Sequence, residues 1–145
     1  MTMNFTSELQ VAPNALTPQI YCDLRQTCSD LFQPYPLEDV KAALQNTLYS
    51  VVVYEEERPV GIARVVGDDR IVFFIKDVVV DPAYQHRSVG TMLMQSILDY
   101  IYKKACPSAY IGLMCTPNTE CFYEKFGFIR RPNEQHGYGM VKFVK

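Results

Sequence analysis

Hydrophobic and polar residues follow two different periods along this chain. Within residues 89–104, Val89, Leu93, Ile97 and Ile101 recur every four positions, which is the spacing of one apolar face of a helix. Runs rich in β-branched residues and bounded by Gly, Pro or Asp predict strands instead. The predicted strands cover residues 4–11, 49–54, 59–66, 70–80, 109–115, 128–131 and 139–144, and the predicted helices cover residues 18–28, 37–46, 89–104 and 119–125.

The order of these elements is β-α-α-β-β-β-α-β-α-β-β, which predicts an α/β fold built on one mixed sheet. Its central strand–helix–strand crossover is expected to be parallel and right-handed. No repeat, low-complexity tract or linker divides the sequence, so we interpret residues 1–145 as a single domain. The charged run Glu55-Glu56-Glu57-Arg58 lies between two predicted strands and indicates a solvated hairpin turn.

The composition is that of an ordinary globular protein, with 48% hydrophobic and 21% charged residues. A net charge of −2 lacks the basic excess of nucleic-acid-binding proteins, so we expect no nucleic-acid partner. Two histidines and five cysteines form neither a CxxC pair nor a zinc-binding cluster, so we expect no metal site. Scattered cysteines in odd number are typical of a reduced protein. Because the sequence shows no signal peptide or membrane-spanning run, the expected location is the cytoplasm, without a membrane partner.

The most informative segment joins the strand that ends at Asp81-Pro82 to the helix that begins near Val89. Between them lies the polar loop Gln85-His86-Arg87-Ser88-Val89-Gly90. A loop of this kind leaves backbone N–H groups of the first helical turn without carbonyl partners, and the helix dipole adds positive potential at the same place. The preferred ligand is a phosphate or pyrophosphate group. The sequence therefore predicts a phosphorylated cofactor.

A second motif lies near the C-terminus, in Phe122-Tyr123-Glu124-Lys125-Phe126-Gly127-Phe128. This segment resembles the FYEKxGF segment of the GNAT superfamily of acyl-CoA N-acyltransferases, and the loop of residues 85–90 resembles that family's Q/R-x-x-G-x-G/A loop. The predicted order of elements is also similar, so the resemblance covers nearly the whole chain. It implies an acetyl-CoA-dependent N-acetyltransferase in which the two central parallel strands splay apart.

The resemblance implies roles for individual residues around the cosubstrate acetyl-CoA. The backbone of Val78, Val79 and Val80, at the end of the strand, would pair with the pantetheine arm. Asn118, after the next strand, and Phe122, in the second motif, would also bind CoA. The residues expected to hold the pyrophosphate, chiefly through backbone amides, are Gln85, His86, Arg87, Ser88, Val89, Gly90 and Thr91.

The same resemblance makes Tyr123 the general acid that protonates the departing thiolate, after direct attack by an amine in a ternary complex. An amine with a pKa near 10.4 is mostly protonated at pH 7, so a group must also accept its proton. Asp77 is the candidate base, and it equally fits a structural residue. A water chain with backbone carbonyls is the alternative. Cys115 and Cys121 have no histidine partner in the sequence, and we interpret them as small apolar residues.

One residue departs from the family pattern, because Ser88 stands at the first glycine of the loop motif. A serine side chain limits close approach and disfavours a positive φ, so we expect an altered affinity for CoA. This departure keeps open a second function, a catalytically weak CoA-binding regulatory module. A third interpretation is a small α/β domain whose loop binds a different anion.

The sequence leaves the acceptor open between a small-molecule amine and a peptide amine. We expect its pocket between the aromatic loop of residues 32–36 and the last strand pair. The residues expected there are Phe32, Tyr35, Phe74, Arg131, Glu134 and Tyr138. Because dimers are frequent in the family, a homodimer is a further expectation, with the C-terminal strand as the surface of exchange.

Overall fold

The computed structural model describes residues 8–145, which group into two compact units that meet after Gly112 in the sequence. The elements of the first unit are β1 (Leu9–Pro13), α1 (Pro18–Gln26), α2 (Leu37–Gln45), β2 (Tyr49–Glu55), β3 (Arg58–Gly67), β4 (Val72–Val80), the 3-10 helix η1 (Pro82–Tyr84), α3 (Val89–Lys104) and β5 (Tyr110–Gly112). The second unit, Leu113–Lys145, contains α4 (Glu120–Glu124). The interpretation of the chain as a single domain stays a prediction.

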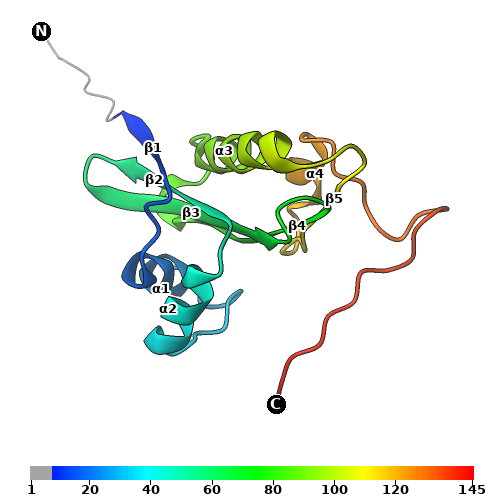
Figure 1. The fold of residues 1–145 in the computed structure, drawn as a ribbon. Helices are drawn as coiled ribbons and strands as arrows, with labels where there is room; N and C mark the ends of the chain where they lie inside the picture. Colours follow the sequence, from blue (N-terminus) through cyan, green and yellow to red (C-terminus); the bar gives the residue numbers. More distant parts are fainter. Residues whose placement is uncertain (1–7) are drawn as a thin grey trace, which may run out of the picture. The chain divides into compact units, whose positions relative to one another are not determined.

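The first unit is a sheet with helices on both faces (Figure 1). Its strands lie in the order β1-β2-β3-β4-β5, and all neighbours are antiparallel except the parallel pair β4–β5. α3 packs on one face, and α1 with α2 covers the other. The valine run Val51–Val53 in β2 is fully buried because both faces of this strand are covered. The predicted α/β fold with a mixed sheet and a parallel β4–α3–β5 crossover is confirmed.

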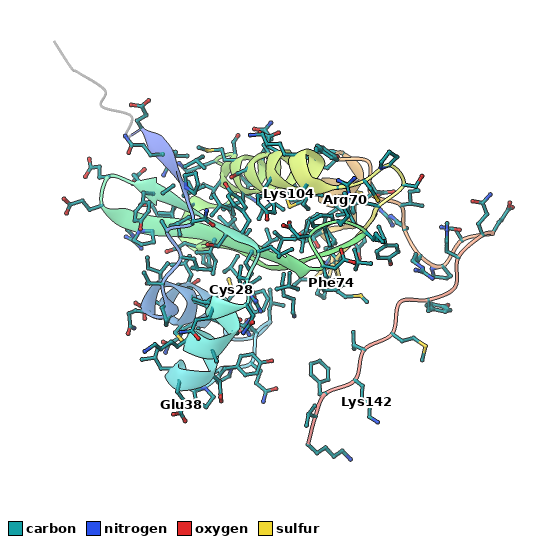
Figure 2. All side chains as sticks on the ribbon, in the orientation of Figure 1. Cys28, Glu38, Arg70, Phe74, Lys104 and Lys142 are labelled. Carbon is teal, nitrogen blue, oxygen red and sulfur yellow. The ribbon has the colours of Figure 1, made fainter. Side chains whose placement is uncertain are left out.

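Local sequence signals define the ends of two helices. Thr17 caps α1, since its hydroxyl accepts a hydrogen bond from the Ile20 N–H at 3.2 Å, and Pro18 occupies the first helical turn. α3 has the predicted bounds, and its last turn is held by Arg70, whose guanidinium donates to the Lys104 carbonyl at 3.1 Å (Figure 2). The local signals therefore located the start of α1 and the span of α3, whereas α1 ends at Gln26, two residues before the predicted end.

The pairing of β3 with β4 is interrupted at one point. Arg64 lies opposite Lys76 and Ile62 lies opposite Val79, so β4 holds one more residue than β3 between these pairs. Asp77, within this bulge, has a left-handed φ of 56°. A bulge of this kind bends the strand and turns its backbone groups away from the regular ladder.

β4 and β5 share a ladder over only three residues of each strand, Val72–Phe74 with Tyr110–Gly112. From Ile75 to Val80, β4 has no strand on that side in the described part of the chain. The strand predicted over residues 109–115 is therefore shorter than expected, because an edge strand that leaves its one neighbour loses its ladder. The result is an open backbone edge along the second half of β4.

The two strands predicted over residues 128–131 and 139–144 are wrong, since neither range forms a strand in the structure. Met140 and Phe143 are 88% and 74% exposed. Apolar alternation specifies a strand only where one face is buried and a neighbouring ladder is present, and both conditions fail here.

Other strand boundaries also differ from the prediction, by one residue at the end of β2 and at each end of β3. β4 begins at Val72 and not at residue 70, because Asp68 Oδ1 accepts hydrogen bonds from the N–H groups of residues 70–72 at 2.7–3.0 Å and forms a turn. In the first predicted strand, residues 4–7 lie outside the described residues, and the observed strand extends to Pro13.

Candidate functional site

The first turn of α3 follows β4 and the polar loop. Met92 is the first residue of α3 whose N–H donates a helical hydrogen bond. Its acceptor is the Ser88 carbonyl, at 3.0 Å. The N–H groups of Val89, Gly90 and Thr91 precede it, and the Ser88 side chain makes no capping hydrogen bond. These N–H groups and the positive end of the helix dipole point to one place. The geometry favours an anion such as phosphate.

The loop before α3 contains two left-handed residues that are not glycine. His86 has a φ of 65° and Ser88 a φ of 66°, and the residues from Gln85 to Ser88 are exposed. This conformation costs a residue with a side chain roughly 1–2 kcal/mol. Ser88 thus adopts, at a cost in strain, a backbone conformation that glycine adopts freely.

Close packing between β3 and α3 fixes the start of the helix. Val89 is 1% exposed, so its side chain belongs to the core and only its backbone faces a ligand. A Cβ atom on Gly61 would lie 2.5 Å from Cγ1 of Val89 and 3.1 Å from Cδ1 of Leu93. The absence of a Cβ at Gly61 therefore lets α3 approach the sheet this closely.

Arg87, a candidate contact for phosphate, is held by the β2–β3 hairpin. Its guanidinium lies 2.9 Å from a carboxylate oxygen of Glu55 and 4.9 Å from the centre of the Tyr84 ring. The Tyr84 hydroxyl donates to the other Glu55 oxygen at 2.7 Å. The hydrogen bond from Tyr84, followed by Arg87, lowers the pKa of Glu55. The prediction of a solvated turn is therefore wrong for Glu55, although Glu56 and Glu57 are exposed.

Val78, Val79 and Val80 form β4 beyond the bulge. Val79 is buried in the core cluster that α1 covers, while Val78 and Val80 are half-buried. On one side Val79 and Val80 pair with Ile62 and Gly61 of β3. The other side has no neighbouring strand, so an extended ligand can meet it with hydrogen bonds, although the Cys28 thiol lies 3.8 Å from the Val80 carbonyl.

The carboxylate of Asp77, the candidate base, is hydrogen-bonded to other side chains. Its side chain is 1% exposed, and its oxygens contact Arg25 and, at 2.7 Å, Nε of Arg64. The Tyr21 hydroxyl donates to Asp77 at 3.0 Å, and burial together with the Asp77 charge raises the pKa of Tyr21 to about 12. Because both oxygens already accept hydrogen bonds, this geometry favours the structural interpretation of Asp77 over that of a base.

Arg25 connects Asp77 to the aromatic loop that follows α1. It donates to the Gln33 carbonyl at 2.7 Å. Its guanidinium carbon lies 5.0 Å from the centre of the Phe32 ring and 5.3 Å from that of Tyr35. A 7% exposed arginine with this many partners fixes the loop against the β4 bulge.

The second unit carries Tyr123 on α4. Tyr123 is 9% exposed, and its ring packs edge-on against Phe122 at 5.0 Å and Phe128 at 6.2 Å. Burial, with a smaller effect of Cys115, raises the pKa of Tyr123 to about 12. Gly127 follows the helix with a φ of 90°, the left-handed cap that the sequence predicts.

Asn118, the other cofactor candidate of this unit, is exposed and has a left-handed φ of 68°. It lies in a turn closed by the Thr119 hydroxyl, which donates to the Thr116 carbonyl at 2.7 Å. Of the expected acceptor residues, Phe32 and Tyr35 contact Arg25, and Arg131 donates to the Gly137 carbonyl at 2.7 Å. The acceptor pocket itself stays a prediction.

The sequence did not indicate the polar residues that contact Asp77 and Arg87, namely Tyr21, Arg25, Glu55, Arg64 and Tyr84. One local signal in the sequence could have indicated two of these residues. Tyr21 and Arg25 are four residues apart on the predicted helix of residues 18–28, on the face that also carries Leu24. A charged residue on an apolar face needs a buried partner, but the partner's position was not encoded locally.

The family follows from comparison with known proteins. The sequence profile of the family described as Acetyltransferase (GNAT) family matches residues 17–128 of this chain. The chain belongs to the GNAT acetyltransferase family. GCN5-related N-acetyltransferase 1, chloroplastic, of Arabidopsis thaliana is 31% identical over 105 residues, which cover 71% of this chain and 52% of that protein. This GNAT chain spans about half to two thirds of the length of such curated relatives.

Solved structures agree with this assignment. A protein of unknown function from meticillin-resistant Staphylococcus aureus, SA2161, described as a probable acetyltransferase, is 30% identical with a TM-score of 0.83, over 94% of this chain and 100% of that one. Aminoglycoside N-acetyltransferase AAC(6')-Iy, solved in complex with CoA, has a TM-score of 0.70 over 99% of both chains. At 14% identity, this second likeness shows the fold alone.

Two further observations concern residues 8–145. No helix in this range has the length and apolar character needed to cross a membrane. Within the same range, no three His, Cys, Asp or Glu side chains gather into a group that could hold a metal ion.

Proposed function

We propose that this GNAT protein transfers the acetyl group of acetyl-CoA to a primary amine, by direct attack in a ternary complex. The observation that carries the proposal is the free first turn of α3 combined with the open edge of β4. The first suits a pyrophosphate, and the second suits the amide groups of a pantetheine arm. The CoA complex of the aminoglycoside N-acetyltransferase, which shares the fold, supports this choice of cosubstrate.

Acetyl-CoA supplies an acetyl group that is activated as a thioester. In the overall reaction a C–N bond forms, the C–S bond breaks, and one proton moves from the amine to the sulfur. The α3 turn and the β4 edge would hold the thioester still while the amine approaches. Holding both reactants in place can by itself supply about 7–11 kcal/mol.

The amine must lose a proton before or during attack. Because Asp77 is already bound by Arg25, Arg64 and Tyr21, we do not assign it this task. We propose instead that a water molecule with backbone carbonyls accepts this proton. Asp77 then acts by fixing the bulge of β4.

Tyr123 is the proposed general acid on the sulfur side. Its pKa of about 12 keeps the phenol protonated at neutral pH, so a hydrogen-bond donor is always present. An ordinary thiol has a pKa near 8.5, so the thiolate is a weaker base than the phenolate. A hydrogen bond to the developing charge is therefore the larger contribution, with complete proton transfer contributing less.

A CoA-binding regulatory module is the alternative function. Its one support in the sequence was Ser88, which stands where the motif has glycine. Ser88 adopts the left-handed φ that glycine adopts freely, which supports a loop conformation unaltered by the substitution. We therefore favour the enzyme.

The acceptor proposed is a small-molecule or peptide amine, and the aromatic loop that Arg25 holds is its expected binding region. We also propose a homodimer and a cytoplasmic location without a membrane partner. A net charge of −2 supports the absence of a nucleic-acid partner.

The proposal is tested by release of free thiol from acetyl-CoA against a panel of amines, beside calorimetry of CoA binding. We expect amine-dependent release. Tight CoA binding without turnover would favour the regulatory module, and a preference for ATP or phosphate over CoA would favour the third interpretation.

The role of Tyr123 is tested with Tyr123→Phe, beside Tyr102→Phe, which removes the hydroxyl of a tyrosine that is 63% exposed on α3. We expect kcat to fall by about 10²-fold in Tyr123→Phe, with the Kd for CoA nearly unchanged. An unchanged kcat would remove Tyr123 from the mechanism.

A further inference from the structure

A cluster of five side chains joins the β2–β3 hairpin to the loop before α3. The hairpin and the start of α3 lie at the same end of the first unit (Figure 1). The cluster, called the hairpin cluster below, consists of Glu55, Arg58, Asp81, Tyr84 and Arg87. Tyr84 and Arg87 stand on either side of Gln85 and His86, so the hairpin contacts the loop at two points.

Glu55 is the centre of this hairpin cluster. One of its oxygens accepts from the Tyr84 hydroxyl at 2.7 Å and the other from Arg87 at 2.9 Å. The Glu55 side chain is 18% exposed, and the Arg87 side chain is 43% exposed. Both contacts therefore depend on a single carboxylate at the end of β2.

The remaining members hold Tyr84 in place. Arg58 lies 5.4 Å above the Tyr84 ring and 3.2 Å from an oxygen of Asp81. The other oxygen of Asp81 accepts from the Ala83 N–H at 2.9 Å, which fixes the start of η1. These contacts support the position of Tyr84, whose hydroxyl donates to Glu55.

The loop from Tyr84 to the start of α3 is strained. His86 and Ser88 both have a left-handed φ, so the conformational strain of the loop is roughly twice that of one such residue. A conformation of this kind persists only where surrounding contacts determine it. The two hydrogen bonds of Glu55, to Tyr84 and to Arg87, are contacts of this kind, and the Arg58 guanidinium over the Tyr84 ring adds a third.

We propose that Glu55 is a positioning residue for the phosphate end of acetyl-CoA. By binding Tyr84 and Arg87 it holds the loop in the conformation that leaves the first-turn N–H groups of α3 open to the pyrophosphate. The inference rests on the proposed function, since it concerns the same site.

The direction in which CoA affinity changes when Glu55 is replaced distinguishes a positioning role from a purely electrostatic effect of its charge. Glu55 is a negative charge near a site for an anion, so removing the charge alone would strengthen the binding of CoA. A positioning role predicts the opposite, because a loosened loop must be ordered again on binding. Glu57 is an exposed carboxylate of the same hairpin and lies outside the hairpin cluster, so it offers a matched loss of charge.

The experiment compares Glu55→Gln, Glu57→Gln and Tyr84→Phe with the wild-type enzyme by calorimetry with CoA and by initial rates. Glutamine keeps one acceptor oxygen but places an NH2 group opposite the other donor. We expect Glu55→Gln to raise the Kd for CoA and the KM for acetyl-CoA about fivefold, or ~1 kcal/mol. Tyr84→Phe should act in the same direction, and Glu57→Gln should leave both constants unchanged or lower.

A positioning role also predicts that kcat at saturating acetyl-CoA and the KM for the amine stay as in the wild type. The inference is overturned if Glu55→Gln binds CoA as well as Glu57→Gln, or if it changes only the free energy of unfolding. Wild-type protein that binds no CoA would instead refute the proposed function, and this is seen before any variant is compared.

Discussion

Asp77→Asn is the substitution that best separates a structural carboxylate from a catalytic one. Asparagine preserves the size of the side chain and one acceptor oxygen, but it removes the negative charge. The side chains of the two arginines that face Asp77, Arg25 and Arg64, are only 9% and 13% exposed. Both guanidinium groups would then lie in the core without a counter-charge.

The magnitude follows from that burial. Removing one partner of a buried ion pair costs about 3–5 kcal/mol, because the other charge stays desolvated. Domains of this size have a total stability of about 5–15 kcal/mol, so the loss is a large fraction. We expect Tm to fall by roughly 10 °C.

The assay is urea unfolding followed by circular dichroism, with kcat measured well below the unfolding transition. Asp99→Asn is the matched control, since Asp99 is exposed on α3. A structural Asp77 predicts a large loss of unfolding free energy and a folded enzyme that still turns over. A loss of less than about 1 kcal/mol, combined with a fall in kcat of about 10²-fold or more, would refute the structural role and support Asp77 as the base.

Three further outcomes are expected. Ser88→Gly should increase the free energy of unfolding by about 1 kcal/mol, because glycine accepts the left-handed φ without strain; a loss of stability in urea unfolding would contradict this. Gly61→Ala should destabilise by about 1–3 kcal/mol, because its Cβ would lie 2.5 Å from Val89, and equal denaturation midpoints would disprove the close contact. Burial raises the pKa of Tyr123 from its ordinary 10.0 to about 12. The neutral phenol therefore contributes stability that is complete below pH 10 and lost as the pH rises toward 12. Unfolding of Tyr123→Phe across this range should lack that part of the alkaline loss, and identical profiles for variant and wild type would argue against the shift.

Much of the fold followed from local patterns in the sequence. The apolar stripe of α3 and the Thr17-Pro18 start of α1 are signals that act within one or two helical turns. The prediction of strands failed at residues 128–131 and 139–144, where the apolar residues had the right composition but no neighbouring ladder. A strand depends on a second segment, and a helix supplies its own hydrogen bonds.

The sequence by itself therefore determined the helices, the valine-rich strands and the polar loop that opens the first turn of α3. The tertiary structure alone decided which charged residues pair with one another. Arg25 meets Asp77 across 52 positions of the chain, and Arg87 meets Glu55 across 32. Neither pair leaves a periodic signal, because such contacts form only when the strands have packed and the β4 bulge has turned Asp77 toward α1. Around Asp77, where the side chains are buried, each unpaired charge would be costly, and that cost selects the partner.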